Sequence, residues 1–351
     1  MRKRLLIFAL TALLCLGLVP TATAAEESYS DVPAGHWAAE SIDRATELGL
    51  FQGVGDGKFG LGQPISRAAF ATAMTRLFGW EEVKPDKPSY TDAAKSSWYY
   101  AAVETVLANG AVDASGHEFR PADNLTRGEM ASMLVRGLGY TSLAGTAANY
   151  GAPFSDVTAN VGYITLANDL GIMDGKGSGR FDPDGNATRE QAAAVLVRVH
   201  DMLERTTTKL SSSKGYQLIN IATPTAKSGD EMPVTPLEPL PELYATLRRM
   251  KNNGEDMSKA ALHLMAGGVR TITDAGGNPI AASSLISAKE VQEVLARKDA
   301  KPFYSTQYES AYCMYDPNAY QSATVWYQSD ESMAAKLQLA KLFGVTHYVM
   351  E

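Results

Sequence analysis

The sequence predicts a mostly α-helical protein in which three tandem helix–loop–helix units precede a small α/β region. Two observations support this fold class. The first is a self-similar unit of about sixty residues that occurs three times before residue 203. The second is a Ser/Thr/Pro-rich stretch after Arg205, beyond which strand-like and helical patterns alternate.

The N-terminus has the pattern of a secretory signal peptide. Arg2, Lys3 and Arg4 precede an apolar run at residues 5–18, and residues 22–24 are the small residues Ala-Thr-Ala. We expect residues 1–24 to be removed on export. No later run approaches the roughly 18 apolar residues of a spanning helix, so we expect a secreted, cell-surface protein without a membrane span.

Charge and cysteine content exclude several classes of partner and site. The 32 basic residues are outnumbered by 39 acidic ones, which disfavours nucleic acid or anionic membranes as partners. Only Cys313 remains after removal of the signal peptide, so we expect no internal disulfide. There is no His-Glu-x-x-His motif, and we expect neither a metal site nor a cofactor.

The repeated units span residues 29–80, 90–140 and 154–202. Each unit begins with an aromatic residue two positions before an aspartate, carries a glycine after its first helical pattern, and begins its second helical pattern with a Ser-Arg or Thr-Arg pair. The opening aspartates are Asp31, Asp92 and Asp156, the glycines are Gly49, Gly110 and Gly171, and the paired arginines are Arg67, Arg127 and Arg189.

Local signals set the helix boundaries in each unit. Ala38, Ile42 and Ala45 recur at helical spacing, and a glycine after such a stripe is typical of a helix end. Glu129 and Gln191 stand three residues after a threonine and predict capping boxes in the second and third units. The expected N-cap residues are Ser66, Thr126 and Thr188.

These units resemble the S-layer homology domain. The resemblance is carried by Asp31-Val32-Pro33, by residues 36–39 (His-Trp-Ala-Ala), by the Gly-rich loop at 55–59 and by the Ser/Thr-Arg signature. It covers residues 29–202 and implies a three-pronged spindle around a central helix bundle. It also implies grooves between the repeats that bind a pyruvylated, acidic secondary cell-wall polysaccharide, a glycan associated with peptidoglycan. In that family the signature arginine and the opening aspartate contact the ligand.

The residues themselves support an anionic ligand. Each signature arginine follows an N-cap, where unpaired backbone N–H groups and the helix dipole favour a negative charge. A guanidinium can also bind a sugar carboxylate through two parallel hydrogen bonds. The candidate polysaccharide-binding residues are Asp31, Trp37, Arg67, Asp92, Trp98, Arg127, Asp156 and Arg189.

Each candidate also has a simpler structural interpretation. A first-turn arginine is often only a solvated charge. If the arginine does bind the glycan, we expect Arg127→Ala to weaken binding without unfolding the domain, because an exposed first-turn side chain contributes little to packing. The aspartates can instead form Asx turns. Trp37 and Trp98 fit a hydrophobic core better than a stacking platform. The third repeat has no tryptophan between Asp156 and Gly171, so its groove is the weakest candidate.

After the repeats, residues 206–241 are rich in Ser, Thr and Pro and are interpreted as an extended linker. In residues 242–351 we expect a strand at 323–327, a helix at 330–343 and a second strand at 345–350. A strand–helix–strand order predicts that the two strands pair in parallel. His263 and His347 lie in strand-like runs and are interpreted as structural, and Cys313 as buried.

Part of this region resembles the end of the family 18 glycoside hydrolase barrel. The likeness rests on residues 325–345 (beginning Val-Trp-Tyr) and on residues 261–267 (Ala-Leu-His-Leu-Met-Ala-Gly). The family's Asp-x-x-Asp-x-Asp-x-Glu motif is missing from the chain, so no catalytic residue is assigned. The residues after 241 are also fewer than half of the about 250 that an eight-stranded barrel needs. We therefore expect a degenerate, non-catalytic, partly barrel-like region.

Three functions fit the sequence. The first is non-covalent anchoring to the bacterial cell wall, with display of a non-catalytic C-terminal region. The second is a wall-anchored glycoside hydrolase acting on chitin or peptidoglycan. The third is a structural protein of an S-layer lattice.

Overall fold

A computed structural model describes residues 29–113, 116–219, 240–305 and 310–350. The expected signal peptide lies outside these ranges. Helices form the repeats, but the C-terminal region adds two β-sheets, so "mostly α" describes the repeats and not the whole chain. Within the described ranges no helix is both long and apolar enough to cross a bilayer.

Each repeat contains the two expected helices. They are α1 (Ala39–Glu47) and α2 (Arg67–Phe78), α3 (Tyr100–Ala108) and α4 (Arg127–Gly137), and α6 (Val161–Asp169) and α7 (Arg189–Glu204), with α5 (Thr141–Ala148) between the second and third repeats. The capping boxes at Glu129 and Gln191 are confirmed. Gly49, Gly110 and Gly171 all have positive φ, which a residue without a side chain adopts at least cost.

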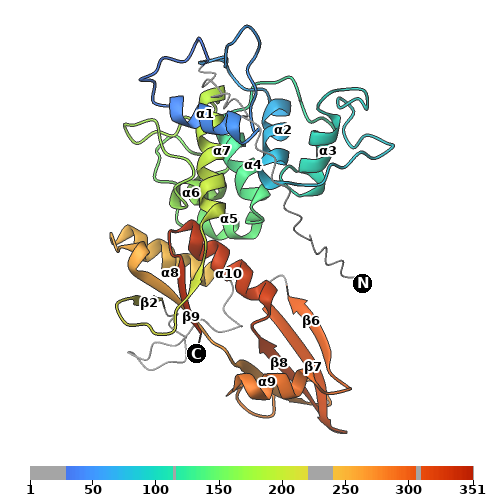
Figure 1. The fold of residues 1–351 in the computed structure, drawn as a ribbon. Helices are drawn as coiled ribbons and strands as arrows, with labels where there is room; N and C mark the ends of the chain where they lie inside the picture. The colour runs from blue at the N-terminus through green and yellow to red at the C-terminus, as the bar shows by residue number, and fades with distance from the viewer. Residues whose placement is uncertain (1–28, 114–115, 220–239, 306–309, 351) are drawn as a thin grey trace, which may run out of the picture.

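The helices of a repeat pack mainly on neighbouring repeats. Helix α3 packs on α2, α6 on α4, and α1 closes the cycle by packing on α7. Each first helix therefore buries its apolar stripe against the second helix of the preceding repeat, because its own unit is too small to cover it. The three repeats form a closed ring, which occupies the upper half of Figure 1.

A triangle of backbone hydrogen bonds lies where the three second helices begin. Ile65 N–H donates to the carbonyl of Ala187, Ala187 N–H to that of Leu125, and Leu125 N–H to that of Ile65, each over 2.9 Å. All three side chains are buried. Buried backbone N–H and C=O groups must find hydrogen-bond partners. At this point each repeat supplies the partner for the next one, so the triangle of bonds requires all three repeats.

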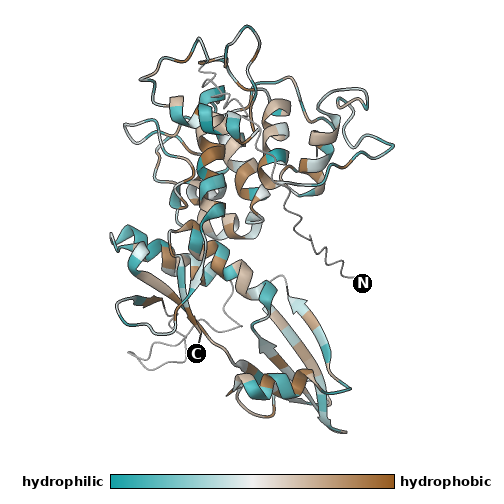
Figure 2. Cartoon of the chain, viewed as in Figure 1, coloured by the Kyte–Doolittle hydropathy of each residue, from teal (hydrophilic) through white to brown (hydrophobic). Residues whose placement is uncertain are grey.

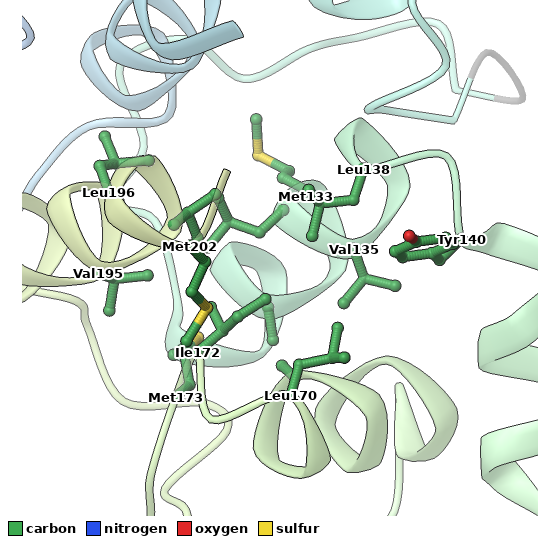
Figure 3. Close-up of a cluster of buried hydrophobic side chains, with 14 of the residues drawn as sticks. Met133, Val135, Leu138, Tyr140, Leu170, Ile172, Met173, Val195, Leu196 and Met202 are labelled. Carbon is green, nitrogen blue, oxygen red and sulfur yellow. The ribbon is translucent and has the colours of Figure 1, made fainter. Parts of the chain in front are cut away.

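The hydrophobic core runs through the centre of the ring. Figure 3 shows Met133 and Val135 of α4 beside Leu170 and Ile172, which follow α6, and Met202 of α7. In Figure 2 the hydrophobic residues of the repeats gather on the helices, whereas the outer loops are largely hydrophilic. Burial of these side chains is the main contribution to the stability of the ring, since the described residues include no disulfide.

The C-terminal region begins with a four-stranded parallel sheet. Its strand order is β1–β9–β3–β2, formed by β1 (Thr208–Lys209), β9 (His347–Met350), β3 (Ala260–Leu264) and β2 (Gln217–Ile219). Strands β1 and β2 lie inside the segment interpreted as a linker, so its first part is an ordered piece of this sheet. His263 and His347 lie on β3 and β9, as the strand pattern predicts.

A second sheet is antiparallel and has five strands. Their order is β5 (Ser284–Ile286), β4 (Gly268–Asp274), β8 (Gln321–Tyr327), β7 (Ser310–Asn318) and β6 (Lys301–Ser305). Helix α9 (Ala288–Leu295) covers one face, where Val291 and Val294 pack with Cys313 and Val325. The expectation that Cys313 is buried is confirmed.

The predicted parallel pairing of the last two strands is wrong. The elements exist as β8, α10 (Asp330–Leu342) and β9, but β8 is antiparallel to both β4 and β7. Because β8 already has a neighbour on each edge, α10 carries the chain away to the parallel sheet. The strand–helix–strand rule applies only when both strands belong to one sheet.

The C-terminal region is docked on the third repeat. Tyr244 and Arg248 of α8 (Leu240–Asn252) both donate to the carboxylate of Asp169 at the end of α6. On the other side, Arg205 Nη1 donates to the carbonyl of Lys341, while Lys341 Nζ donates to that of Leu203. The C-terminal ends of α7 and α10 thus provide hydrogen-bond donors for each other's last carbonyl groups. One hydrophobic core also continues from the ring of repeats into the C-terminal region.

Candidate functional site

The three opening aspartates hold the Gly-rich loops of their own repeats. The carboxylate of Asp31 accepts hydrogen bonds from the N–H groups of Phe59, Gly60 and Leu61 over 2.7–2.9 Å. Asp92 and Asp156 accept equivalent bonds, from Phe119 and Arg120 and from Phe181 and Asp182 respectively. These bonds span 25–30 residues, so they are long-range loop anchors and not local Asx turns.

The same hydrogen bonds change the acidity of two of these groups. The N–H of Phe181 is the main cause that holds the pKa of Asp156 below its usual 3.8, although burial opposes it. Burial acts most strongly to raise the pKa of Asp31, yet the three N–H donors outweigh it and the pKa is lowered. Hydrogen bonds to a carboxylate stabilise its charged form.

Acid is therefore expected to loosen the third repeat through Asp156. Since its pKa is lower in the folded than in the unfolded chain, this stabilisation is present above about pH 4 and is lost as pH falls through the folded-state pKa. The urea midpoint of Asp156→Asn, followed from pH 6 to pH 2.5, should fall less steeply than that of wild type. Asp184→Asn, an exposed neighbour, is the control, and parallel curves for wild type and Asp156→Asn would contradict the assignment.

The signature arginines are not solvated first-turn charges. Arg127 is only 6% exposed; its Nε donates to the carbonyl of Phe181 over 2.9 Å and its Nη2 to that of Asp174 over 2.8 Å. Its guanidinium also lies 4.6 Å from the ring centroid of Phe181. Burial lowers the pKa of Arg127, while the carboxylates of Asp182, Asp156 and Asp174 act in the opposite direction.

The other two arginines repeat this arrangement around the ring. Arg67 Nε donates to the carbonyl of Phe119 over 2.8 Å, and Arg189 Nε to that of Phe59 over 2.9 Å. Each arginine thus starts the second helix of one repeat and holds the loop of the next. The expectation that these side chains are exposed and contribute little to packing is wrong, because they point across the boundary between repeats.

The two tryptophans point outward. Trp37 is 62% exposed and Trp98 is 69% exposed, so the core interpretation is wrong for both. Trp37 of the first repeat lines a pocket of about 230 Å³, called here the Arg127 groove. Its wall combines Arg127 of the second repeat with Lys176, Gln191 and Arg198 of the third. The structure thus brings two sequence-predicted residues, Trp37 and Arg127, into one groove.

Two cationic residues of this groove were not predicted from the sequence. Arg198 donates to the carbonyls of Gly171 and Ile172 and lies 3.4 Å from the carboxylate of Asp174. Lys176 pairs with Asp182 over 2.7 Å. The sequence did contain a pattern that could have identified Arg198. In every repeat a second arginine stands nine residues after the signature arginine; these are Arg76, Arg136 and Arg198.

A second pocket occupies the equivalent place one repeat earlier. It measures about 280 Å³ and is called here the Arg67 groove. Its wall combines Arg67 with Asp113, Glu129 and Arg136 of the second repeat, and Asn160, directly before α6, also lines it. Its lining contains no aromatic side chain. In the described part of the chain, no group of His, Cys, Asp or Glu residues is arranged to hold a metal ion.

Comparison with known proteins identifies the repeats. Residues 28–71, 89–131 and 153–193 match the S-layer homology domain family. S-layer protein sap of Bacillus anthracis is 30% identical over 216 residues, which is 60% of this chain and 26% of that protein. An S-layer protein of Bacillus licheniformis is 33% identical over 200 residues, 56% of this chain and 22% of the relative.

The similarity extends to enzymes as well as S-layer proteins. An endoglucanase of Bacillus sp. (strain KSM-635) is 30% identical over 201 residues, 54% of this chain and 21% of the enzyme. In each of these relatives the match therefore covers only about a quarter of the protein's length or less.

Solved structures overlap the chain weakly. The spore cortex-lytic enzyme SleL of Bacillus megaterium QM B1551 covers 39% of this chain and 30% of its own, with 17% identity and a TM-score of 0.30. A family GH18 chitinase from Cycas revoluta covers 30% of this chain and 32% of its own, with 23% identity and a TM-score of 0.26. That residues 242–351 form a degenerate hydrolase barrel stays a prediction.

The repeat pattern, the ring that the repeats close and the family match agree with one another. The chain carries three S-layer homology domains and is a cell-surface protein.

Proposed function

We propose that residues 29–202 anchor this protein non-covalently to the bacterial cell wall by binding a pyruvylated, acidic secondary cell-wall polysaccharide. The grooves lie between the prongs of the expected spindle, and the C-terminal region is displayed from the anchor as a non-catalytic unit. The observation that carries the proposal is the Arg127 groove, in which the exposed indole of Trp37 lies with Arg127, a guanidinium that forms no ion pair with any carboxylate of the described residues.

The chemistry of this groove suits a sugar that carries a carboxylate. A ketal-linked carboxylate is attracted by the guanidinium of Arg127, and charge-assisted hydrogen bonds to guanidinium are among the stronger kind. The apolar face of a pyranose ring can stack on Trp37, whose indole combines a large apolar surface with a polar N–H. Arg127 is itself held by the carbonyls of Phe181 and Asp174, so its position is set before a ligand arrives.

The relatives support an anchoring role that is independent of the attached domain. The chain is similar over 200–216 residues to S-layer proteins and over 201 residues to an endoglucanase, which are two different kinds of protein. A surface-attachment module can be shared by both. Because the chain matches only about a quarter of each relative, their own activities are not transferred to it.

A sedimentation assay with purified cell-wall sacculi tests the proposal. We expect the mature chain to sediment with intact sacculi and to remain in solution with sacculi from which the secondary polysaccharide has been extracted. Equal binding to both preparations would overturn the proposed ligand. Free pyruvylated polysaccharide should also compete, whereas polysaccharide from which the ketals have been hydrolysed should not.

Trp37→Ala is expected to weaken binding to sacculi about tenfold while leaving the thermal midpoint unchanged. The reason is that the side chain is 62% exposed and lines the groove without contributing to the core. The measurement is a binding isotherm on sacculi together with a thermal melt. Tyr320→Ala is the matched control, because Tyr320 is 80% exposed on the distant β7–β8 turn. An equal loss of affinity in both variants would remove Trp37 from the site.

A further inference from the structure

We infer that the grooves are not equivalent: the carboxylate of Glu129 closes the Arg67 groove to anions, and the acidic glycan enters the Arg127 groove instead. This inference rests on the proposed function and specifies where the ligand binds. Both grooves are built from corresponding positions of successive repeats, so a difference between them must come from the side chains at those positions.

The carboxylate of Glu129 already forms an ion pair with the guanidinium of Arg67. Its Oε1 lies 2.8 Å from Arg67 Nη1 and also accepts from Arg120 Nη2. Its Oε2 accepts from the N–H of Thr126 over 3.0 Å as part of the capping box. The side chains of Arg67 and Glu129 are only 12% and 24% exposed. A carboxylate of this protein therefore fills the place that a ligand carboxylate would take.

The corresponding residue carries no charge in the other repeats. Gln191 lines the Arg127 groove and keeps its capping contact to the N–H of Thr188. Ala69 is the corresponding residue in the first repeat, whose loop carbonyl at Phe59 accepts from Arg189. Among the described residues, no carboxylate forms an ion pair with Arg127 or Arg189. The charge of Arg127, which lines its groove, is thus not neutralised by an ion pair of the protein's own.

The pairing of charges in the two grooves points the same way. In the Arg127 groove, Lys176 is paired with Asp182 and Arg198 with Asp174, and no carboxylate of the described residues forms an ion pair with Arg127. In the Arg67 groove, Arg136 is paired with Asp113, and Arg67 itself is paired with Glu129. An anion entering this second groove must displace Glu129 from Arg67, and the other carboxylate oxygen of Glu129 is held by the helix N-cap.

Two reciprocal substitutions test the assignment, and each exchanges a residue for the one at the same position of another repeat. Glu129→Gln removes the charge from the Arg67 groove, and Gln191→Glu adds one to the Arg127 groove. Both capping boxes tolerate either residue, because Glu and Gln each form one in this chain. The helix ends are therefore expected to stay intact, which the far-UV circular dichroism spectrum of each variant verifies.

The probe is a methyl hexoside with a 4,6-linked pyruvate ketal, titrated calorimetrically into the mature chain. We expect Gln191→Glu to lower the affinity at least tenfold or abolish one binding event, and Glu129→Gln to add one binding event. Wild-type stoichiometry and affinity in both variants would overturn the inference. If wild type binds sacculi and neither substitution changes that binding, the proposed function stands and the inference is wrong.

A measurement of thermal stability without ligand distinguishes the inference about Glu129 from the proposed function. If Glu129 neutralises Arg67, the loss of thermal midpoint caused by Glu129→Gln should shrink by at least half in an Arg67→Gln background. Fully additive losses would overturn the closure of the Arg67 groove even if the proposed ligand were wrong. Failure of wild type to bind both the probe and intact sacculi would reject the proposed function instead.

Discussion

Arg127→Ala is expected to destabilise the ring of repeats by about 3 kcal/mol, and not merely to weaken glycan binding. The side chain is 6% exposed and donates charged hydrogen bonds to the carbonyls of Phe181 and Asp174 in the next repeat. Truncation leaves these carbonyls without that donor and removes the guanidinium from the face of the Phe181 ring. This expectation reverses the one that the sequence favours, in which Arg127→Ala acts on binding alone.

Urea unfolding followed by circular dichroism measures this effect. Arg44→Ala is the control, because Arg44 is an arginine of the repeats whose side chain is 46% exposed and pairs with Glu47 of its own helix. Its midpoint should stay close to that of wild type. Arg127→Lys should fall between wild type and the alanine variant, since an ammonium keeps the charge but not the planar fork. An unchanged midpoint for Arg127→Ala would show that the link between the repeats contributes little.

Asp169→Ala is expected to separate the C-terminal region from the repeats, with a loss of about 3 kcal/mol. The carboxylate is 8% exposed and accepts from the Tyr244 hydroxyl and from Arg248 Nε, the latter over 2.7 Å. Tyr244 is fully buried, and burial together with the hydrogen bond to Asp169 raises its pKa. Without the aspartate, a buried hydroxyl and a partly buried guanidinium lose their shared acceptor.

Differential scanning calorimetry distinguishes this outcome from a general loss of stability. Wild type should unfold in one main transition, because a single hydrophobic core joins the ring to α8 and α10. The variant should show two transitions, and protease cleavage within residues 206–241 should become faster. Asp174→Ala, which removes an exposed carboxylate of the same repeat, should leave a single transition. One cooperative transition in Asp169→Ala at the wild-type midpoint would contradict the proposed role of this contact.

The candidate site shows which of its features residue type and spacing can predict and which they cannot. The recurrence of Arg67, Arg127 and Arg189 identified equivalent positions in the three repeats, but the tryptophans were expected in the core and are exposed. The direction of each arginine side chain was predicted wrongly, because the first turn of a helix can face solvent or a neighbour and spacing does not distinguish the two. Trp37 joins Arg127 only because the first repeat packs on the third and closes the ring.

The sequence by itself determined the two helices of each repeat, their caps and the number of repeats, whereas α5, α8 and α9 were not predicted. The capping box of Thr126 and Glu129 and the glycine after each first helix depend on contacts within four residues, so spacing alone reveals them. The tertiary structure decided which sheet β8 and β9 join and which loop each arginine holds. Arg189 reaches Phe59 across 130 residues, and Arg127 reaches Phe181 across 54. Such long-range contacts depend on which faces of helices and strands are buried against each other. A local sequence pattern does not specify that pairing.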